Sequence, residues 1–305
     1  MNLLITGGTG FIGRTLIRQR LSAGHQIFVL TRSRSKAQQT LPNTVKCIQS
    51  LDDIGDDTAI DQIVNLAGEP LVGKRWNRAS KQMFVDSRVE TTQALIDFIA
   101  RRAQKPRVLV SGSAIGYYGD RADETLTEDS AAGHEYTSDL CHQWEQTAEQ
   151  ATQYGVRVCV LRIGVTLGAD DGPFPTMARP FKLGVGGRLG HGQQWLSWIH
   201  IEDLTNLIGH LLDHASLQGV FNGTAPEPVT NRTLTHTLGA VLHRPSFWVV
   251  PGFVLRFLMG GVAHILLTGQ KVLPQNTLDS GFEYRYPTLD NAVTALLAEQ
   301  KKPAS

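Results

Sequence analysis

Cysteine is scarce in this sequence of 305 residues, which contains only Cys47, Cys141 and Cys159. No two of them form a CxxC pair, and no paired histidines stand at metal-ligand spacing beside them. A disulfide framework is therefore excluded, and no metal site is expected. Cys47 and Cys159 lie in apolar runs typical of strands, where we expect them to be buried.

Charge of one sign is also lacking, since the formal net charge is +1 at pH 7. A chain without a basic surplus has no electrostatic footprint for nucleic acid, so we expect no nucleic-acid partner. No basic segment precedes the first apolar run, as a signal peptide would require. The sequence therefore predicts a cytoplasmic protein.

Long hydrophobic runs are absent except at residues 247–269, "FWVVPGFVLRFLMGGVAHILLTG". Arg256 lies near the centre of this run, where an arginine costs about 2.5 to 3.5 kcal/mol on a membrane-insertion scale. Pro251 and His264 interrupt the run as well. We expect no membrane span but a buried helix pair, whose exposed part could bind a partner protein.

Glycine is concentrated in the first thirteen residues, "MNLLITGGTGFIG". Residues 3–5 predict a strand and residues 11–21 predict a helix, with Gly7, Gly10 and Gly13 between and within them. At this spacing the first glycine permits a tight turn, the second a close approach to a pyrophosphate, and the third close helix–strand packing. Phosphates would lie at the helix N-terminus, where unpaired N–H groups favour negative charge. The pattern predicts a dinucleotide cofactor.

The end of the second predicted strand, "QIFVLT", selects between NAD and NADP. A carboxylate there would bind the free 2′-hydroxyl of NAD, whereas an arginine suits the 2′-phosphate of NADP. The chain has Thr31 followed by Arg32, so we predict NADP, bound at these two residues. Arg34 and Lys36 could belong to a solvated basic loop.

Further strands are predicted at residues 45–48, 62–67, 107–113 and 157–165, with helices at residues 81–102 and 136–154. Strands that alternate with helices build a parallel sheet with helices on both faces. The predicted fold class is α/β, a doubly wound Rossmann sheet with a smaller C-terminal substrate lobe. Ligands of such sheets bind beyond the carboxyl ends of the strands.

The pattern of predicted elements along the chain divides it into two parts. We expect an NADP-binding domain at residues 1–165, to which residues 200–225 return. Residues 166–199 and 226–305 would form the smaller substrate and lid lobe. The glycine-rich stretch at residues 168–199 is typical of loops that cover a cleft.

The segments "TGGTGFIG", "NLAGEP", "SGSAIGYYGD", "LRIGVTLG" and "WIHIEDL" stand in the order found in extended short-chain dehydrogenase/reductases. The whole chain, including "GQKVLPQ", resembles an atypical group among them, the epimerase family proteins, which are NAD(P)-dependent epimerase/dehydratase-like. The resemblance implies cofactor contacts in the first two segments, at Gly7, Thr9, Gly10, Phe11, Ile12, Gly13, Leu66, Ala67 and Gly68.

Arg88 follows Ser87 on the predicted helix at residues 81–102. A helix that crosses the carboxyl edge of the sheet would aim this arginine at the cofactor or the cleft, and members of the group carry a similar Ser-Arg pair. We expect a cofactor contact; the alternative is a surface ion pair.

In that superfamily a serine and a Tyr-x-x-x-Lys motif carry out the chemistry. The lysine lowers the pKa of the tyrosine, and the serine holds the substrate oxygen. Ser113 and Tyr136 match the serine and the tyrosine and are the predicted catalytic residues. Leu140 stands where the lysine would be, and residues 106–181 contain no lysine. With a pKa of about 10, Tyr136 would act as a neutral phenol that donates a proton, or else pack as a structural ring.

Four other residues could take part. Tyr117 and Tyr118 follow the strand that ends near Ser113. His200 lies in the cleft-covering stretch, but it could merely hold a loop against the next helix. Arg162 ends a strand, where it could bind a substrate phosphate or carboxylate, or pair structurally.

Two functions stay open at this point. The first is an NADP-dependent oxidoreductase or epimerase/dehydratase acting on a small polar substrate, for example a sugar nucleotide, with the cofactor regenerated within the site. The second is a non-catalytic NADPH-binding sensor or scaffold that contacts a partner through its apolar C-terminal lobe. The missing lysine favours the sensor, whereas Ser113 and the glycine-rich lid favour the enzyme, which we prefer.

Overall fold

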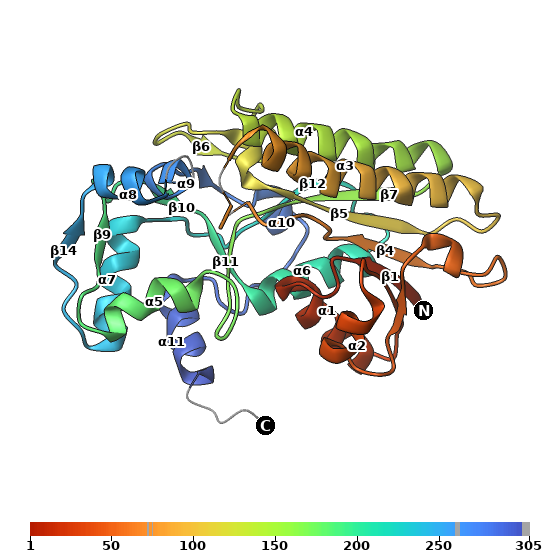
Figure 1. The fold of residues 1–305 in the computed structure, drawn as a ribbon, viewed down its shortest axis with the longest axis horizontal. Coiled ribbons are helices and arrows are strands. Elements are labelled where there is room, and N and C mark those ends of the chain that lie inside the picture. The colour runs from red at the N-terminus through yellow and green to blue at the C-terminus, as the bar shows by residue number, and fades with distance from the viewer. Residues whose placement is uncertain (72, 75, 260–262, 301–305) are drawn as a thin grey trace.

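Seven parallel strands form the central sheet of the computed structural model, which describes residues 1–71, 73–74, 76–259 and 263–300 (Figure 1). From edge to edge they are β12 (Gly219–Gly223), β7 (Arg157–Ile163), β5 (Val108–Ala114), β4 (Gln62–Asn65), β1 (Asn2–Thr6), β2 (Gln26–Leu30) and β3 (Lys46–Ile48). Every neighbouring pair is parallel. The strand order reverses between β1 and β4, which opens a crevice at their carboxyl ends. The predicted doubly wound α/β fold is confirmed.

Helices cover both faces of this sheet (Figure 1). They are α1 (Phe11–Ser22), α2 (Arg34–Thr40), α3 (Arg78–Arg101), α4 (Tyr136–Glu149) and α6 (Ile201–Asp213). Leu3 and Ile5 of β1 pack into a core cluster with α1 and α6, whereas Leu4 packs into a second cluster with α3. All three side chains are fully buried, which contributes about 1.5 to 3 kcal/mol each.

Local signals explain where these helices begin and end. α1 ends at Ser22, one residue beyond the predicted end, and Gly24 follows with a φ of +80°. α3 begins three residues before the predicted start, because Asn77 and Ser80 form a capping box there. α4 begins at Tyr136 and passes into a 3₁₀ turn, η3 (Gln150–Tyr154).

The stretch predicted as loops between residues 168 and 199 contains regular elements, so that prediction is wrong. After β8 (Val165–Leu167) the elements are α5 (Phe174–Lys182), β9 (Gly187–Leu189), β10 (Trp195–Leu196) and β11 (Trp198–His200). α5 buries Phe174, Ala178 and Phe181, which lie at helical spacing. Pro180 inside the helix and the glycines after it obscured this period in the sequence.

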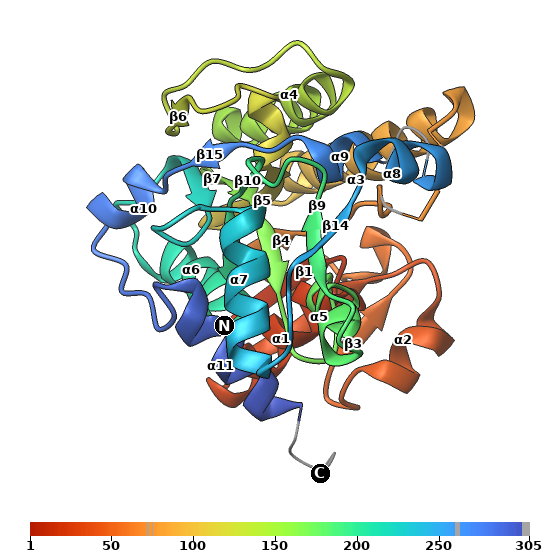
Figure 2. The same ribbon diagram turned by 90° about the vertical axis from the view of Figure 1, so that its left-hand side faces the viewer.

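The C-terminal part shares a hydrophobic cluster with β8, α5 and β11. Its elements are β13 (Val229–Thr230), α7 (Asn231–Leu242), β14 (Trp248–Val250), α8 (Gly252–Met259), α9 (Ala263–Leu267), β15 (Lys271–Val272), α10 (Gln275–Asp279) and α11 (Leu289–Glu299). Leu234 and Leu238 of α7 pack with Val293 and Leu296 of α11 in this cluster; Figure 2 views the molecule from this end. The division of the chain into a cofactor domain and a smaller lobe stays a prediction.

The apolar run at residues 247–269 forms β14, α8 and α9, with residues 260–262 outside the described part. No helix in the described ranges is long and apolar enough to cross a membrane. The expected burial of the helix pair is wrong: Leu255 is 8% exposed, but Phe253 is 71% and Phe257 88% exposed. The two phenylalanines stand four residues apart on α8, so they share its outward face.

Candidate functional site

Two glycines shape the loop between β1 and α1. Gly7 has a φ of +68°, in the left-handed region that favours glycine, and a Cβ atom on it would overlap the carbonyl oxygen of Leu66. A Cβ atom on Gly13 would overlap the carbonyl oxygen of Gly7. Gly7 therefore lets the loop press closely against the residues that follow β4, and Gly13 lets the start of α1 pack against the loop itself.

The N-terminus of α1 opens into the crevice between β1 and β4. Thr9 and Gly10 lead into the helix, and no side chain caps it at Gly10. The N–H groups of Phe11, Ile12 and Gly13 belong to the first turn, which has no intrahelical acceptors for them. Such an end binds phosphate through its N–H groups and its dipole.

Thr6 joins this loop to β4. Its hydroxyl donates to Asn65 Oδ1 at 2.6 Å and accepts from the N–H of Ala67 at 3.1 Å. Leu66, Ala67 and Gly68 therefore run alongside the glycine loop. The structure thus brings the two predicted groups of cofactor contacts to one crevice.

Phe11 anchors a second loop beside the start of α1. Its ring fills the space that a Cβ atom on Gly168 would need, and a Cβ on Gly172 would lie 2.7 Å from the ring. Arg14 forms an ion pair with Asp171 in the same loop. The loop after β8 thus borders the predicted phosphate site, even though the rest of its stretch folds into helix and strands.

Thr31 and Arg32 follow β2 at the other side of the glycine loop. The Arg32 side chain is 93% exposed, and its Nη1 lies 3.5 Å from Oε2 of Glu69. Glu69 also accepts from Lys74 Nζ at 2.7 Å, and this bond, aided by the charge of Arg32, lowers the pKa of Glu69. The Thr31 hydroxyl accepts from the N–H of Ser33 at 3.3 Å. Since Arg32 is exposed and its one ion pair among the described residues is long, it can turn to a phosphate.

Arg88 of α3 reaches the crevice beside Gly68. A Cβ atom on Gly68 would lie 2.9 Å from the guanidinium carbon, so the glycine makes room for it. Nη1 of Arg88 donates to the carbonyl oxygens of Glu69 at 3.2 Å and Phe84 at 3.1 Å. The guanidinium carbon also lies 5.3 Å from the ring centre of Trp144.

The charge of Arg88 has no carboxylate in ion-pair contact within the described residues. Burial lowers the pKa of Arg88, and the more distant groups Cys141, Tyr136 and Glu69 only partly oppose this effect. An arginine nevertheless stays protonated. A largely desolvated cation without a counter-ion is suited to an anionic or hydroxyl-bearing ligand. The alternative of a surface ion pair is not what the structure shows.

Ser113 is held by a buried ion pair. Its hydroxyl lies 2.5 Å from Oε1 of Glu145, while Arg162 binds both oxygens of that carboxylate at 3.0 and 2.9 Å. Burial alone would lower the pKa of Arg162, but the hydrogen bonds and charge of Glu145 outweigh it and raise the pKa. Since a carboxylate only accepts, Ser113 donates its proton to Glu145. Its oxygen can then accept from a ligand but has no proton to offer one.

Two tyrosines complete the surroundings of Arg162. Nη1 of Arg162 donates to Tyr118 Oη at 3.0 Å, and Tyr118 donates to Asn222 Oδ1 at 2.7 Å. Burial raises the pKa of Tyr118 to about 12. The guanidinium carbon lies 3.4 Å from the ring centre of Tyr117. Protein groups thus occupy the guanidinium of Arg162, which favours its structural interpretation over a substrate contact.

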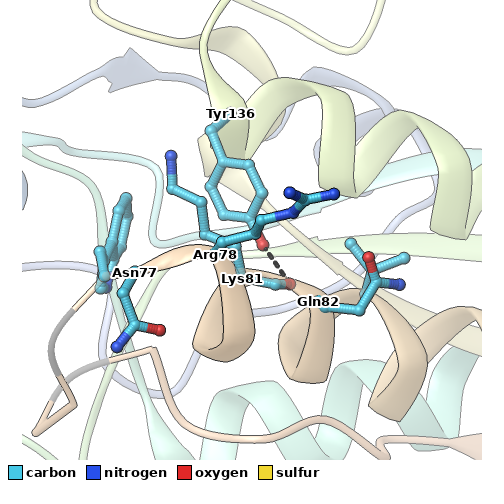
Figure 3. A pocket seen from close by; sticks show the side chains of 7 residues that line it. Asn77, Arg78, Lys81, Gln82 and Tyr136 are labelled. Carbon is cyan, nitrogen blue, oxygen red and sulfur yellow. Dashed lines mark hydrogen bonds between the residues drawn. The ribbon is translucent and has the colours of Figure 1, made fainter.

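Tyr136 turns toward α3 (Figure 3). Its hydroxyl donates to the carbonyl oxygen of Lys81 at 2.8 Å, and its ring centre lies 5.8 Å from that of Trp76. Burial raises the pKa of Tyr136 although the charge of Arg88 opposes it. The Ser113 hydroxyl bonds to Glu145 and the Tyr136 hydroxyl to Lys81, so the two predicted catalytic hydroxyls have different hydrogen-bond partners.

A second residue of α4 beside Ser113, one turn before Glu145, is Cys141. The hydroxyl of Ser113 and the N–H of Ala114 both influence the Cys141 thiol, whose pKa burial raises to about 11. Leu140, where the motif lysine would stand, is 2% exposed. A lysine at that position would be buried within the protein.

His200 is fully buried at the N-terminus of α6. Its Nδ1 accepts from the N–H of Glu202 at 3.2 Å, and its ring centre lies 3.9 Å from that of Tyr286. Burial, aided by the charge of Arg285, lowers the pKa of His200 to about 4. These contacts favour the structural interpretation of this histidine. In the described part of the chain, no group of three or more His, Cys, Asp or Glu could hold a metal ion.

Sequence reasoning missed Glu145 and Lys81. Glu145 lies on the face of α4 that also buries Cys141 and Trp144. A carboxylate on a buried helix face needs a partner, so this position was a usable signal. Lys81 carried no such signal, because Tyr136 bonds to its backbone carbonyl oxygen, a group that every residue has.

Comparison with known proteins places most of the chain in one family. The profile described as "NAD dependent epimerase/dehydratase family" matches residues 3–222, and that of a "Domain of unknown function (DUF1731)" matches residues 250–296. The Arabidopsis thaliana protein named epimerase family protein SDR39U1 homolog, chloroplastic, is 41% identical over 312 residues, which are 97% of this chain and 87% of that protein. The Bacillus subtilis epimerase family protein YfhF is 36% identical over 306 residues and 99% of both chains.

Two solved structures have the same fold. The human epimerase family protein SDR39U1 (isoform 2), crystallised with NADPH, has a TM-score of 0.87 and 33% identity, with 98% of this chain and 99% of that one covered. UDP-glucose 4-epimerase of Thermotoga maritima, crystallised with UDP-glucose, has a TM-score of 0.79 at 16% identity over 98% of each chain. The second likeness concerns the fold alone.

Proposed function

Because the chain belongs to the NAD dependent epimerase/dehydratase family, as its resemblance to the epimerase family proteins predicted, we propose that it is an NADP-dependent oxidoreductase or epimerase/dehydratase-like enzyme. One observation carries the proposal. The uncapped start of α1, with Gly7 and Gly13, faces Gly68 and the unpaired Arg88 across a single crevice. The NADPH complex of the human relative, which matches nearly the whole chain, supports the choice of cofactor.

Different residues of the chain would contact different parts of the cofactor. The first turn of α1 binds the pyrophosphate through its N–H groups. Thr31 and Arg32 bind the 2′-phosphate at the end of β2, and Leu66, Ala67 and Gly68 line the crevice. Arg88 of α3, beside Gly68, would contact the ribose or the phosphate nearer the reacting end. NADP, when bound, supplies hydride exchange with a substrate carbon.

Tyr136 is the proposed proton donor. Burial keeps its phenol neutral at pH 7, which is the form that protonates a substrate oxygen. Its hydroxyl leaves the carbonyl of Lys81 to do so. If a substrate is found, Tyr136→Phe should lower turnover by about a hundredfold. Unchanged turnover would move the role to another group. A sugar-nucleotide substrate stays a prediction.

The cofactor assignment is tested by titration with NADPH and NADH. Arg32 can form charge-assisted hydrogen bonds with a 2′-phosphate, so NADPH should bind about tenfold more tightly or better. Arg32→Asp should reverse the preference, whereas Lys36→Asp, on the exposed side of α2, should leave it. Equal affinities of the unaltered protein for the two cofactors would contradict the assignment.

A sensor or scaffold is the second candidate function. The exposed apolar side chains of β14 and α8 favour it, because Trp248 is 53%, Phe253 71% and Phe257 88% exposed. Large exposed apolar groups mark surfaces for partners. A substrate screen that monitors NADPH oxidation, with Ser113→Ala as control, separates the two: the sensor binds NADPH but oxidises none with any substrate. The cytoplasmic location stays a prediction.

A further inference from the structure

A cavity of about 360 Å³ lies beside Tyr136 at the start of α3 (Figure 3). Small-molecule sites commonly have volumes of about 300 to 1,000 Å³, so the cavity has room for a small ligand. Its lining residues are Trp76, Asn77, Arg78, Lys81, Gln82, Val85 and Tyr136.

Two aromatic rings with occupied polar atoms form part of its wall. Trp76 donates its indole N–H to the carbonyl oxygen of Leu71 at 2.9 Å. Tyr136 donates its hydroxyl to the carbonyl oxygen of Lys81 at 2.8 Å. The two rings meet edge to face, with their planes at 67°. Rings fixed in this way present apolar surface to a flat ligand skeleton.

The charged groups of the lining are all of one sign. Arg78 and Lys81 are both cationic, and no carboxylate lines the cavity. Lys81 Nζ lies 4.6 Å from the ring centre of Tyr136, and in Figure 3 the ends of Arg78 and Lys81 project on either side of that ring. The helix end itself is satisfied by the capping box of Asn77 and Ser80. The positive charge therefore comes from side chains, not from open N–H groups.

The cavity and Arg88 lie along the same helix, α3. Val85 lines the cavity, and Arg88 stands three residues further on the same face. The charge of Arg88 acts on Tyr136, which belongs to both regions. Arg88 therefore lies on the side of Tyr136 where the cofactor is proposed to bind. Arg78 and Lys81 lie on its other side, in the lining of the cavity.

We propose that this cavity binds the substrate through an anionic group, a carboxylate or phosphate carried on a small flat skeleton. Arg78 and Lys81 would bind the anion, while Trp76 and Tyr136 would contact the skeleton. Naming the occupant a substrate rests on the proposed function; the binding of an organic anion does not.

Benzoate and benzamide test the proposal, because they share a shape but differ in charge. The indole N–H signal of Trp76 in an NMR spectrum, assigned with Trp76→Phe, reports binding to the purified full chain. Benzoate should bind about tenfold more tightly than benzamide. Arg78→Gln together with Lys81→Gln should remove this difference, whereas Arg107→Gln, an exposed residue before β5, should keep it.

Saturating NADPH should leave benzoate binding intact. The proposal is overturned if benzamide binds as tightly as benzoate, if the double variant retains the difference, or if NADPH displaces benzoate. Failure of the proposed function has a different signature. In that case no substrate of the screen would cause NADPH oxidation, while benzoate would still shift the Trp76 signal.

Discussion

Arg162 and Arg88 differ in whether a carboxylate of the described residues pairs with the guanidinium group. Arg162 binds both oxygens of Glu145 and also bonds to Tyr118. Arg88 bonds to backbone carbonyl oxygens, such as that of Glu69, and meets no carboxylate in the described residues. Both guanidinium groups are largely desolvated, yet the pKa of Arg162 is raised and that of Arg88 is lowered.

A desolvated charge costs several kcal/mol unless a partner compensates it. For Arg162 the compensation is internal, so the folded chain is complete without a ligand there. For Arg88 the described residues supply carbonyl dipoles and the ring of Trp144 but no carboxylate. The difference favours a structural role for Arg162 and supports the proposal that Arg88 binds a ligand.

The largest expected effect is therefore on stability, at Arg162. Arg162→Met leaves Glu145 as a buried charge without its partner, which should lower the free energy of unfolding by about 3 to 5 kcal/mol. Urea denaturation followed by circular dichroism measures this loss. The double variant with Glu145→Leu should recover much of it, because no buried charge remains. A loss below about 1 kcal/mol in the single variant would show that the pair is not a structural one.

His200 extends the comparison to a buried group that stays neutral. Its pKa is about 4 in the folded protein, against about 6.5 unfolded. The unfolded chain therefore binds the proton first as the pH falls. The contribution of His200 is complete above pH 6.5 and is lost between pH 6.5 and 4, on the order of 3 kcal/mol in total.

The variant His200→Asn isolates this contribution, since its amide oxygen can still cap α6. Unfolding free energies of both proteins are measured from pH 7 to pH 4, and only their difference is used, because other groups titrate in both. The unaltered protein should lose more stability than the variant over this range. Parallel curves would mean that His200 is protonated as easily in the folded as in the unfolded state.

The fold and the glycine loop could be predicted because their signals are local in the chain. Leu3 to Gly13 contain the strand, turn and helix start within a few residues, and the apolar period of each element is unbroken. Between residues 168 and 199 the same reasoning failed, because Pro180 lies within α5 and short strands bury few residues. Propensity is a weak guide where tertiary contacts determine the structure.

The catalytic side could be predicted only in part. Ser113, Glu145 and Arg162 meet through side chains that lie far apart in the sequence, and no spacing rule connects them. Helix rotation is the other difficulty, since one residue turns the face of a helix by about 100°. The Tyr-x-x-x-Lys spacing points to Leu140, but Cys141 and Glu145 are the residues that α4 turns toward Ser113.

Loss of Arg88 should reduce NADPH affinity more than stability, whereas loss of Arg162 should mainly reduce stability. Arg88→Met removes a desolvated cation, so the unfolding free energy should change by less than about 1 kcal/mol. NADPH affinity should fall about tenfold or more, because a hydrogen bond to a charged group contributes about 1.5 to 3 kcal/mol. Fluorescence titration measures the affinity, and Arg107→Met is the control for a lost arginine. Unchanged affinity with reduced stability would place Arg88 in the same class as Arg162.

The smallest expected effect is on stability, when the hydroxyl group of Tyr136 or of Tyr118 is removed. Tyr136→Phe removes one hydrogen bond, to a carbonyl of Lys81 that already lies within α3, so stability should fall by about 0.5 to 1 kcal/mol. Tyr118→Phe leaves Asn222 Oδ1 without its donor and removes one of several hydrogen bonds of Arg162, and it should cost about 1 to 3 kcal/mol. Both variants keep the ring and its packing, so thermal and urea unfolding compare the hydroxyl groups alone. If Tyr136→Phe proved the more destabilising of the two, the hydroxyl of Tyr136 would be fixed in the fold, and it could not leave Lys81 to act on a substrate.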